Sequence, residues 1–86
     1  MSIVVRKPTE AEKTEMLGCP TWECAVSKFD WHYDSSETCL LTAGAVTVSY
    51  DGGSVSIAAG DYVIFPAGLS CTWDVTAAVK KHYFFD

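Results

Sequence analysis

Apolar and polar residues alternate with a period of two over most of the chain after residue 20. Successive side chains of a β-strand point to opposite faces of its sheet, so this period predicts half-buried strands. Seven or eight short strands at nearly regular spacing predict an antiparallel sandwich or barrel. The stretches that show the period are 22–26, 29–33, 37–42, 45–50, 54–58, 62–65, 71–75 and 79–85.

Glycine and aspartate mark the turns between these stretches. Asp51-Gly52-Gly53 predicts a tight hairpin, since glycine adopts a positive φ without steric cost. Gly60 and Gly68 predict turns on either side of the strand 62–65, and Gly44 is expected to end the strand that begins at residue 37.

The first 19 residues differ from this pattern. Thr9 and Glu12 have the spacing of a capping box, which predicts a helix of about two turns that ends near Gly18. Met16 and Leu17 form its apolar side, and we expect them to cover an open end of the barrel. The 86 residues therefore predict one domain, with a strand and helix in residues 1–19 and the barrel in residues 20–86.

Charge and hydropathy exclude two classes of partner. The net charge is −5 and the six Lys and Arg residues are scattered, so there is no basic patch for nucleic acid. No apolar run is long enough for a membrane span, and the first residues lack the features of a signal peptide. We therefore expect a cytoplasmic protein whose four cysteines stay reduced.

Four residues with metal-binding or catalytic side chains are predicted to face the interior. Asp30 and His32 are two residues apart, so on a strand they share a face. Glu37 and Cys71 each begin a set of alternating apolar residues, which predicts that both point inward. If their strands are neighbours, these four side chains converge inside the barrel.

The spacing of these residues resembles the two cupin motifs. Asp30-x-His32-x4-Glu37-x6-Gly44 is similar to His-x-His-x(3,4)-Glu-x6-Gly. Residues 60–71, Gly-x5-Pro-x-Gly-x2-Cys, are similar to the first part of Gly-x5-Pro-x-Gly-x2-His-x3-Asn. The chain resembles small single-domain cupins that are related to the cupin domains of (S)-ureidoglycine aminohydrolase, many of which have no assigned activity. The resemblance implies a cupin-type jelly-roll β-barrel, commonly assembled as a homodimer.

The resemblance also implies a candidate metal site, with departures from the family pattern. Asp30 and Cys71 stand where the motifs have histidine, and only His32 and Glu37 keep their types. Two carboxylates, an imidazole and a thiolate can hold Zn²⁺ or Fe²⁺, whereas the thiolate suits Mn²⁺ less well. The alternative is that the barrel holds no metal and that Glu37 and His32 form hydrogen bonds within the protein.

The function expected from these features is the binding of a small polar metabolite, with or without chemistry assisted by a metal. Trp31, Tyr33 and Trp73 are candidate ligand-binding residues, although alternation with Asp30 and His32 would place Trp31 on the outer face or at an interface. A metal-free, non-catalytic dimeric module is the first alternative.

A second alternative is an enzyme in which Cys71 is the nucleophile and His32 its base. In the metal-dependent interpretation, Asp30 would instead be a ligand or a general base. The sequence leaves open whether the protein is an enzyme at all.

Overall fold

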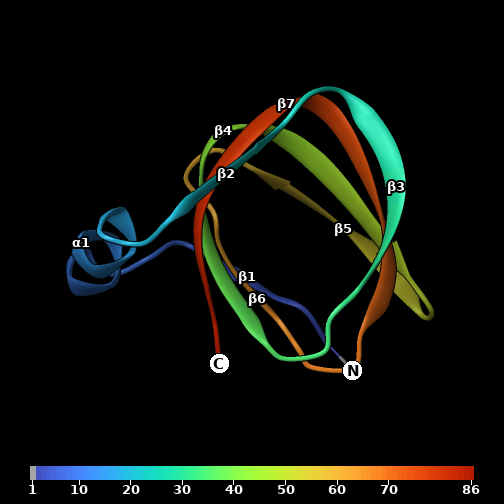
Figure 1. Ribbon diagram of the computed structural model, residues 1–86, viewed down its shortest axis with the longest axis horizontal. Coiled ribbons are helices and arrows are strands. Elements are labelled where there is room, and N and C mark those ends of the chain that lie inside the picture. Colours follow the sequence, from blue (N-terminus) through green and yellow to red (C-terminus); the bar gives the residue numbers. More distant parts are fainter. Residues whose placement is uncertain (1) are drawn as a thin grey trace.

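The computed structural model describes residues 2–86 and contains one helix and seven strands in that range. Every strand pairing is antiparallel, and the sheet curls into an open barrel (Figure 1). The predicted all-β fold with one short N-terminal helix is confirmed. The elements are β1 (Val4–Arg6), α1 (Glu10–Leu17), β2 (Thr21–Cys24), β3 (Ser27–His32), β4 (Glu37–Tyr50), β5 (Gly53–Ala58), β6 (Tyr62–Phe65) and β7 (Ser70–Phe85).

The two long strands β4 and β7 pair with each other and carry the rest of the sheet. β4 also pairs with β5 and β6, whereas β7 pairs with β2 and β3. The expectation that Gly44 ends a strand is wrong, because β4 continues through it. Gly44 has φ +86° and lies where the pairing with β7 shifts register, so it forms part of a bulge that bends the strand.

The helix begins and ends as predicted. The Glu12 amide donates to Thr9 Oγ1 at 3.2 Å, the Thr9 amide donates to Glu12 Oε1 at 2.9 Å, and Gly18 is the C-cap. Its expected place over an open end of the barrel is wrong. Met16 is buried against Leu40 and Tyr62, and α1 lies outside the wall (Figure 1).

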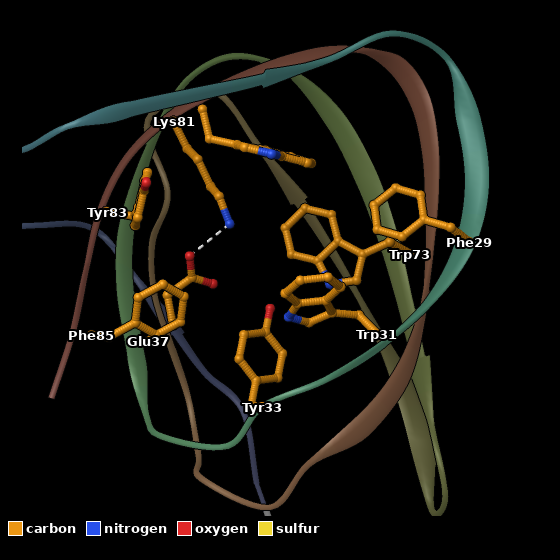
Figure 2. Close-up of a pocket in the computed structure, with 9 residues that line it drawn as sticks. Phe29, Trp31, Tyr33, Glu37, Trp73, Lys81, Tyr83 and Phe85 are labelled. Atoms are coloured by element: carbon orange, nitrogen blue, oxygen red, sulfur yellow. Dashed lines mark hydrogen bonds and ion pairs between the residues drawn. The ribbon is translucent and has the colours of Figure 1, made fainter.

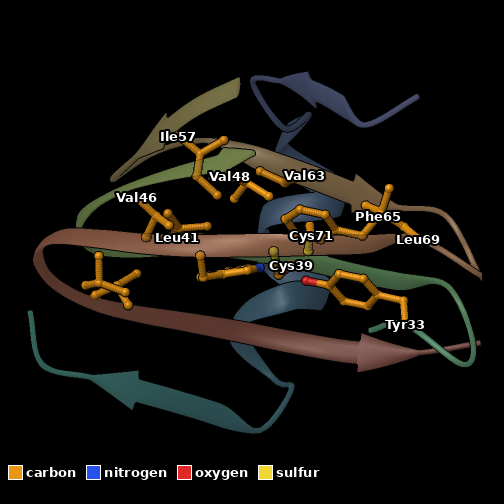
Figure 3. Packing of buried hydrophobic residues seen from close by; sticks show 13 residues of the cluster. Tyr33, Cys39, Leu41, Val46, Val48, Ile57, Val63, Phe65, Leu69 and Cys71 are labelled. Atoms are coloured by element: carbon orange, nitrogen blue, oxygen red, sulfur yellow. The ribbon is translucent and has the colours of Figure 1, made fainter. Parts of the chain in front are cut away.

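The core consists of the side chains that point into the barrel, as the period of two predicts (Figure 3). On β4 the inward residues are Cys39, Leu41, Val46 and Val48, all at most 1% exposed. Leu40 lies between two of them in sequence and faces the helix on the outside. The alternation therefore separates one core inside the barrel from a smaller one under α1.

Within residues 2–86, no helix has the length and apolar character needed to cross a bilayer. The one helix of this range, α1, has eight residues.

Candidate functional site

The inward face of β3 is formed by aromatic residues. Phe29 is paired with Trp73 and Trp31 with Cys71, and paired residues of antiparallel strands project to the same side. Tyr33 continues this alternation just beyond the end of β3, and it is fully buried. Figure 2 shows the Phe29, Trp31 and Tyr33 side chains projecting toward the inside of the barrel. The expectation that Trp31 lies on the outer face is therefore wrong.

Asp30 and His32 lie on the outer face of the same strand. Asp30 Oδ1 accepts a hydrogen bond from Thr72 Oγ1 at 2.8 Å, and His32 Nδ1 lies 2.8 Å from Ser70 Oγ. His32 Nε2 is 3.7 Å from Asp34 Oδ1. Asp30, His32 and Asp34 are all exposed to solvent.

The expected convergence of Asp30, His32, Glu37 and Cys71 inside the barrel is therefore wrong. Glu37 and Cys71 point inward as predicted, but the other two are one residue out of register with the inner face. A shift of one residue moves a side chain to the opposite face of a sheet. Residues 2–86 contain no group of three or more His, Cys, Asp or Glu side chains placed to hold a metal ion.

The barrel encloses a cavity of about 230 Å³ beside Glu37. The three residues predicted from the sequence to bind a ligand, Trp31, Tyr33 and Trp73, all line it. Trp31 and Phe85 are each 50% exposed and form part of its rim (Figure 2). The remaining lining residues are Trp22, Phe29, Lys81 and Tyr83.

A buried ion pair crosses the polar side of the cavity. Lys81 Nζ donates to Glu37 Oε2 at 2.8 Å, and the two side chains are 8% and 3% exposed (Figure 2). The ammonium also lies over the rings of Trp73 and Trp22, at 4.7 and 4.9 Å from their centroids. Aromatic faces attract a cation, and the attraction is stronger where water is excluded.

Lys81 was not singled out from the sequence, where it counts only as one of six scattered basic residues. A signal was present, since Val79, Lys81 and Tyr83 alternate in phase and Val79 is apolar. A lysine in the inward phase of a core strand requires a partner. Glu37, also in an inward phase, was the available carboxylate.

Two buried polar atoms face other core side chains. Glu37 Oε1 and Trp73 Nε1 form no hydrogen bond of ordinary length with any residue of the described range. The Tyr33 hydroxyl is nevertheless directed at the Glu37 carboxylate, and the Trp73 N–H at the Cys71 sulfur. Each contact joins a donor to an acceptor, so the polar atoms of this region are neighbours of one another.

The hydroxyl of Tyr33 stays protonated. Burial, together with the nearby Glu37 carboxylate, raises the pKa of Tyr33 well above its ordinary value. A neutral phenol is a poor ligand for a divalent cation but a good hydrogen-bond donor. Tyr33 therefore contributes a polar, uncharged group to the cavity.

The arrangement does not provide a Cys–His pair. Cys71 projects inward opposite Trp31, whereas His32 projects outward opposite Ser70, so the two side chains are on different faces of the sheet. Burial raises the pKa of the Cys71 thiol, and it raises the pKa of Cys39 to about 12. Both cysteines are therefore thiols at neutral pH, and the expectation of a nucleophilic Cys71 activated by His32 is wrong.

The cupin motif fits the structure when its variable spacing is three residues instead of four. The pattern then falls on Trp31-x-Tyr33-x3-Glu37, with Cys71 from the second motif. Of these four inward positions, only Glu37 and Cys71 carry a donor that a divalent metal ion prefers. The Lys81 ammonium already holds one oxygen of Glu37. These residues do not fit the metal site that the motif implies.

Comparison with known proteins supports the cupin fold. The family model described as the EutQ-like cupin domain matches residues 11–83 of the sequence. The chain belongs to this family. A crystal structure of a DUF861 family protein from Thermotoga maritima is 41% identical, with a TM-score of 0.93 over 99% of this chain and 100% of that one.

Longer EutQ proteins share the fold of this small cupin. A putative ethanolamine utilization protein Q from Salmonella typhimurium is 22% identical, with a TM-score of 0.69 over 76% of this chain and 53% of that one. The Clostridium difficile EutQ protein is 21% identical, with a TM-score of 0.71 over 96% of this chain and 66% of that one. This chain thus spans between half and two thirds of those proteins. No curated protein matches the chain, and the relation to (S)-ureidoglycine aminohydrolase stays a prediction.

Proposed function

We propose that this EutQ-like cupin binds a small polar molecule in the cavity beside Glu37 and Lys81, and that binding needs no metal ion. The observation that carries the proposal is an aromatic cavity lined by the buried Glu37–Lys81 ion pair. Lys81 Nζ donates to Glu37 Oε2 at 2.8 Å, so the cavity has a polar side without net charge between its aromatic walls. A small polar molecule can interact with this side while its apolar part contacts the rings.

The size of the cavity supports a small metabolite as the ligand. A volume of about 230 Å³ corresponds to roughly seven or eight molecules of liquid water. Aromatic walls with a few polar groups are typical of small-molecule sites. The Lys81 ammonium takes the role of a resident cation, which in other proteins a metal ion can fill.

The proposal can be tested by NMR on protein labelled with ¹⁵N in its tryptophans. A library of small polar compounds should contain binders that shift the indole signals of Trp22, Trp31 and Trp73. The double variant Glu37→Gln/Lys81→Met removes both charges together and should lose these shifts. A His32→Ala variant, altered only on the outer face, should keep them.

Two results would contradict the proposal. One is a library without any compound that shifts the cavity tryptophans. The other is binding that persists in the double variant at wild-type affinity, since the Glu37–Lys81 pair would then have no part in recognition.

The homodimer stays a prediction, which the edge strand β1 supports. Among the described strands β1 pairs only with β6, and its Val4 and Val5 are 42% and 37% exposed. Such an edge favours coverage by another chain. Sedimentation should give twice the monomer mass of 9.4 kDa, and Val5→Lys should shift the equilibrium toward the monomer. A wild-type protein that is monomeric at high concentration would rule the dimer out.

A further inference from the structure

Lys81 differs from the other lysines of the chain in its surroundings. Its side chain is only 8% exposed and lines the cavity. Figure 2 shows this side chain extending from the barrel wall toward Glu37. Among the described lining residues Lys81 carries the one primary amine, which makes it a potential nucleophile. The other lysines are all exposed to solvent: Lys7, Lys13, Lys28 and Lys80.

The groups around the Lys81 nitrogen stabilise a positive charge. Glu37 Oε2 lies 2.8 Å from Nζ, and the rings of Trp73 and Trp22 have their centroids 4.7 and 4.9 Å away. The centroid of the Tyr83 ring is 5.8 Å away. A carboxylate and aromatic faces attract a cation of any kind, so they do not require that the nitrogen carry the three hydrogens of an ammonium ion.

A protonated imine has the same charge as the ammonium ion from which it forms. When an amine condenses with an aldehyde or ketone, the carbonyl oxygen leaves as water and a C=N bond takes its place. The nitrogen can keep its positive charge beside Glu37 and the aromatic rings, so the product adds no unpaired charge to the barrel.

We infer that Lys81 is a nucleophile that forms an imine with a small aldehyde or ketone in the cavity. Lysine amines that form such imines are known in sites where the amine is enclosed by apolar groups. The inference rests on the proposed binding function, and adds to it the class of ligand and a covalent step.

Glu37 is placed to carry the protons of this step, because its Oε2 already accepts the hydrogen bond from Nζ. The carboxylate takes a proton from the ammonium, and the freed electron pair of Nζ forms a bond to the carbonyl carbon as the C=O π electrons move to oxygen. Glu37 gives this proton to that oxygen and takes a second proton from the nitrogen, which leaves a neutral carbinolamine.

The second half of the step expels water. Glu37 donates its proton to the carbinolamine hydroxyl, which leaves as water while the nitrogen electron pair forms the C=N bond. The products are the protonated imine, one water molecule and the Glu37 carboxylate. The reaction therefore needs no oxidant or reductant.

The cavity limits the carbonyl compound by size and polarity. Its volume is about 230 Å³, and apart from Glu37 and Lys81 its described lining residues are all aromatic. An apolar or planar substituent can contact the rings while the carbonyl carbon faces Lys81. The favoured ligands are small, uncharged aldehydes and ketones. Esters and amides also contain a carbonyl group, but they do not form imines with lysine.

Benzaldehyde with sodium cyanoborohydride tests the inference, because the hydride converts an imine into a stable secondary amine. Wild-type protein is treated at neutral pH for successive times, and fragmentation mass spectrometry of its peptides gives the rate at each lysine. Lys81 should gain a benzyl group roughly tenfold faster than the exposed neighbour Lys80, or more. Benzyl alcohol, which has a similar shape but no carbonyl group, should add no mass.

A matched set of variants identifies the reacting amine. Lys81→Arg keeps a positive charge beside Glu37 but has no primary amine, and should lose the rapid labelling. Lys80→Met should label at the wild-type rate. If Lys81→Arg does not fold, the wild-type peptide map decides the question, since it compares Lys80 and Lys81 in the same molecule.

Labelling of Lys81 at the same rate as Lys80, or more slowly, would overturn the imine. If Lys81 stays unmodified while a compound of the wider library shifts the cavity tryptophans, the imine fails and the binding function stands. If Lys81 stays unmodified and neither benzaldehyde nor any library compound shifts a cavity tryptophan, the proposed function fails as well.

Discussion

Lys81 and Glu37 form a buried ion pair although they are not cross-strand partners. In the β4–β7 register Glu37 is opposite Phe85, and Lys81 is opposite Leu41. Both residues project inward, and the long lysine side chain reaches along the wall until Nζ is 2.8 Å from Oε2. The stem and head of Lys81 are thereby enclosed by aromatic rings, with the side chain 8% exposed. The pair organises the polar side of the cavity.

Removal of one member of this pair should be strongly destabilising. Lys81→Met leaves a buried carboxylate without its cation, and we expect the free energy of unfolding to fall by about 3–5 kcal/mol. The double variant Glu37→Gln/Lys81→Met leaves no charge and should recover a large part of that loss. Urea unfolding of wild type, both single variants and the double variant measures the coupling.

A neighbouring exposed pair provides the control. Lys80 Nζ lies 3.9 Å from Glu23 Oε1, and these side chains are 47% and 72% exposed. Lys80→Met should change the free energy of unfolding by less than about 1 kcal/mol, as surface pairs contribute little. Similar losses for Lys80→Met and Lys81→Met would contradict the special role of the buried pair.

The four cysteines should react with iodoacetamide in an order set by burial. Cys39 is fully buried and Cys71 is 7% exposed, and burial raises the pKa of both thiols. Cys19 and Cys24 are only partly buried. Since the thiolate is the reactive form, Cys19 and Cys24 should be labelled first at pH 7.5.

Mass spectrometry of peptides at successive times gives the labelling rate of each cysteine. The rates at Cys39 and Cys71 should rise as the pH increases, because a larger fraction of each raised-pKa thiol then ionises. Rapid labelling of Cys71 at neutral pH, ahead of Cys19, would restore the nucleophile hypothesis.

The fold could be predicted because its signals are local and repeated. The period of two, the turn glycines and the capping box from Thr9 to Glu12 each depend on a few adjacent residues. The continuity of β4 could not be predicted in the same way. Whether Gly44 ends a strand or bends it depends on the partner strand β7, which is distant in sequence.

The site could be predicted only in part. Glu37 and Cys71 were placed correctly on the inner face, but the cupin spacing allows three or four residues before the glutamate. The choice of four residues placed Asp30 and His32 inside. The large rings at Phe29 and Tyr33 favour the other choice, since packing them against the core gains more than burying a carboxylate and an imidazole.

Gly44 should tolerate no side chain. A Cβ at this position would overlap the carbonyl oxygen of Ala78, and φ is +86°. We expect Gly44→Ala to lower the free energy of unfolding by more than about 3 kcal/mol, from backbone strain and from the clash within the β4–β7 bulge. Thermal unfolding followed by circular dichroism measures the loss.

Gly52 is the matched control for that substitution. It also has a positive φ, of +109°, but a Cβ there would meet no atom within 4 Å. Gly52→Ala should therefore cost only the backbone strain, about 1–2 kcal/mol. Equal losses at the two glycines would show that the close approach to Ala78 is unimportant.

The register of β3 can be tested by building a metal site in the barrel, where residues 2–86 provide no group of metal-binding side chains. If Trp31 and Tyr33 face the cavity, the variant Trp31→His/Tyr33→His/Cys71→His, combined with Lys81→Met, gives three imidazoles and the Glu37 carboxylate in the inward positions. Three nitrogen ligands and one oxygen suit tetrahedral Zn²⁺ or Co²⁺. Co²⁺ absorption and a Zn²⁺-dependent rise in the melting temperature should both appear, the latter as expected for a ligand of the native state.

The same set of metal-binding side chains should not bind a metal ion when two of its histidines occupy the outward positions of β3. Asp30→His/Cys71→His with Lys81→Met, together with the natural His32, also gives three histidines and Glu37. Here two of the imidazoles lie outside the barrel, because Asp30 and His32 pair with outward-facing Thr72 and Ser70. This variant should bind Co²⁺ no better than its Lys81→Met parent. Tighter binding by this set than by the inward set would mean that β3 presents Asp30 and His32 to the cavity, and the assignment of its inner face would have to be reversed.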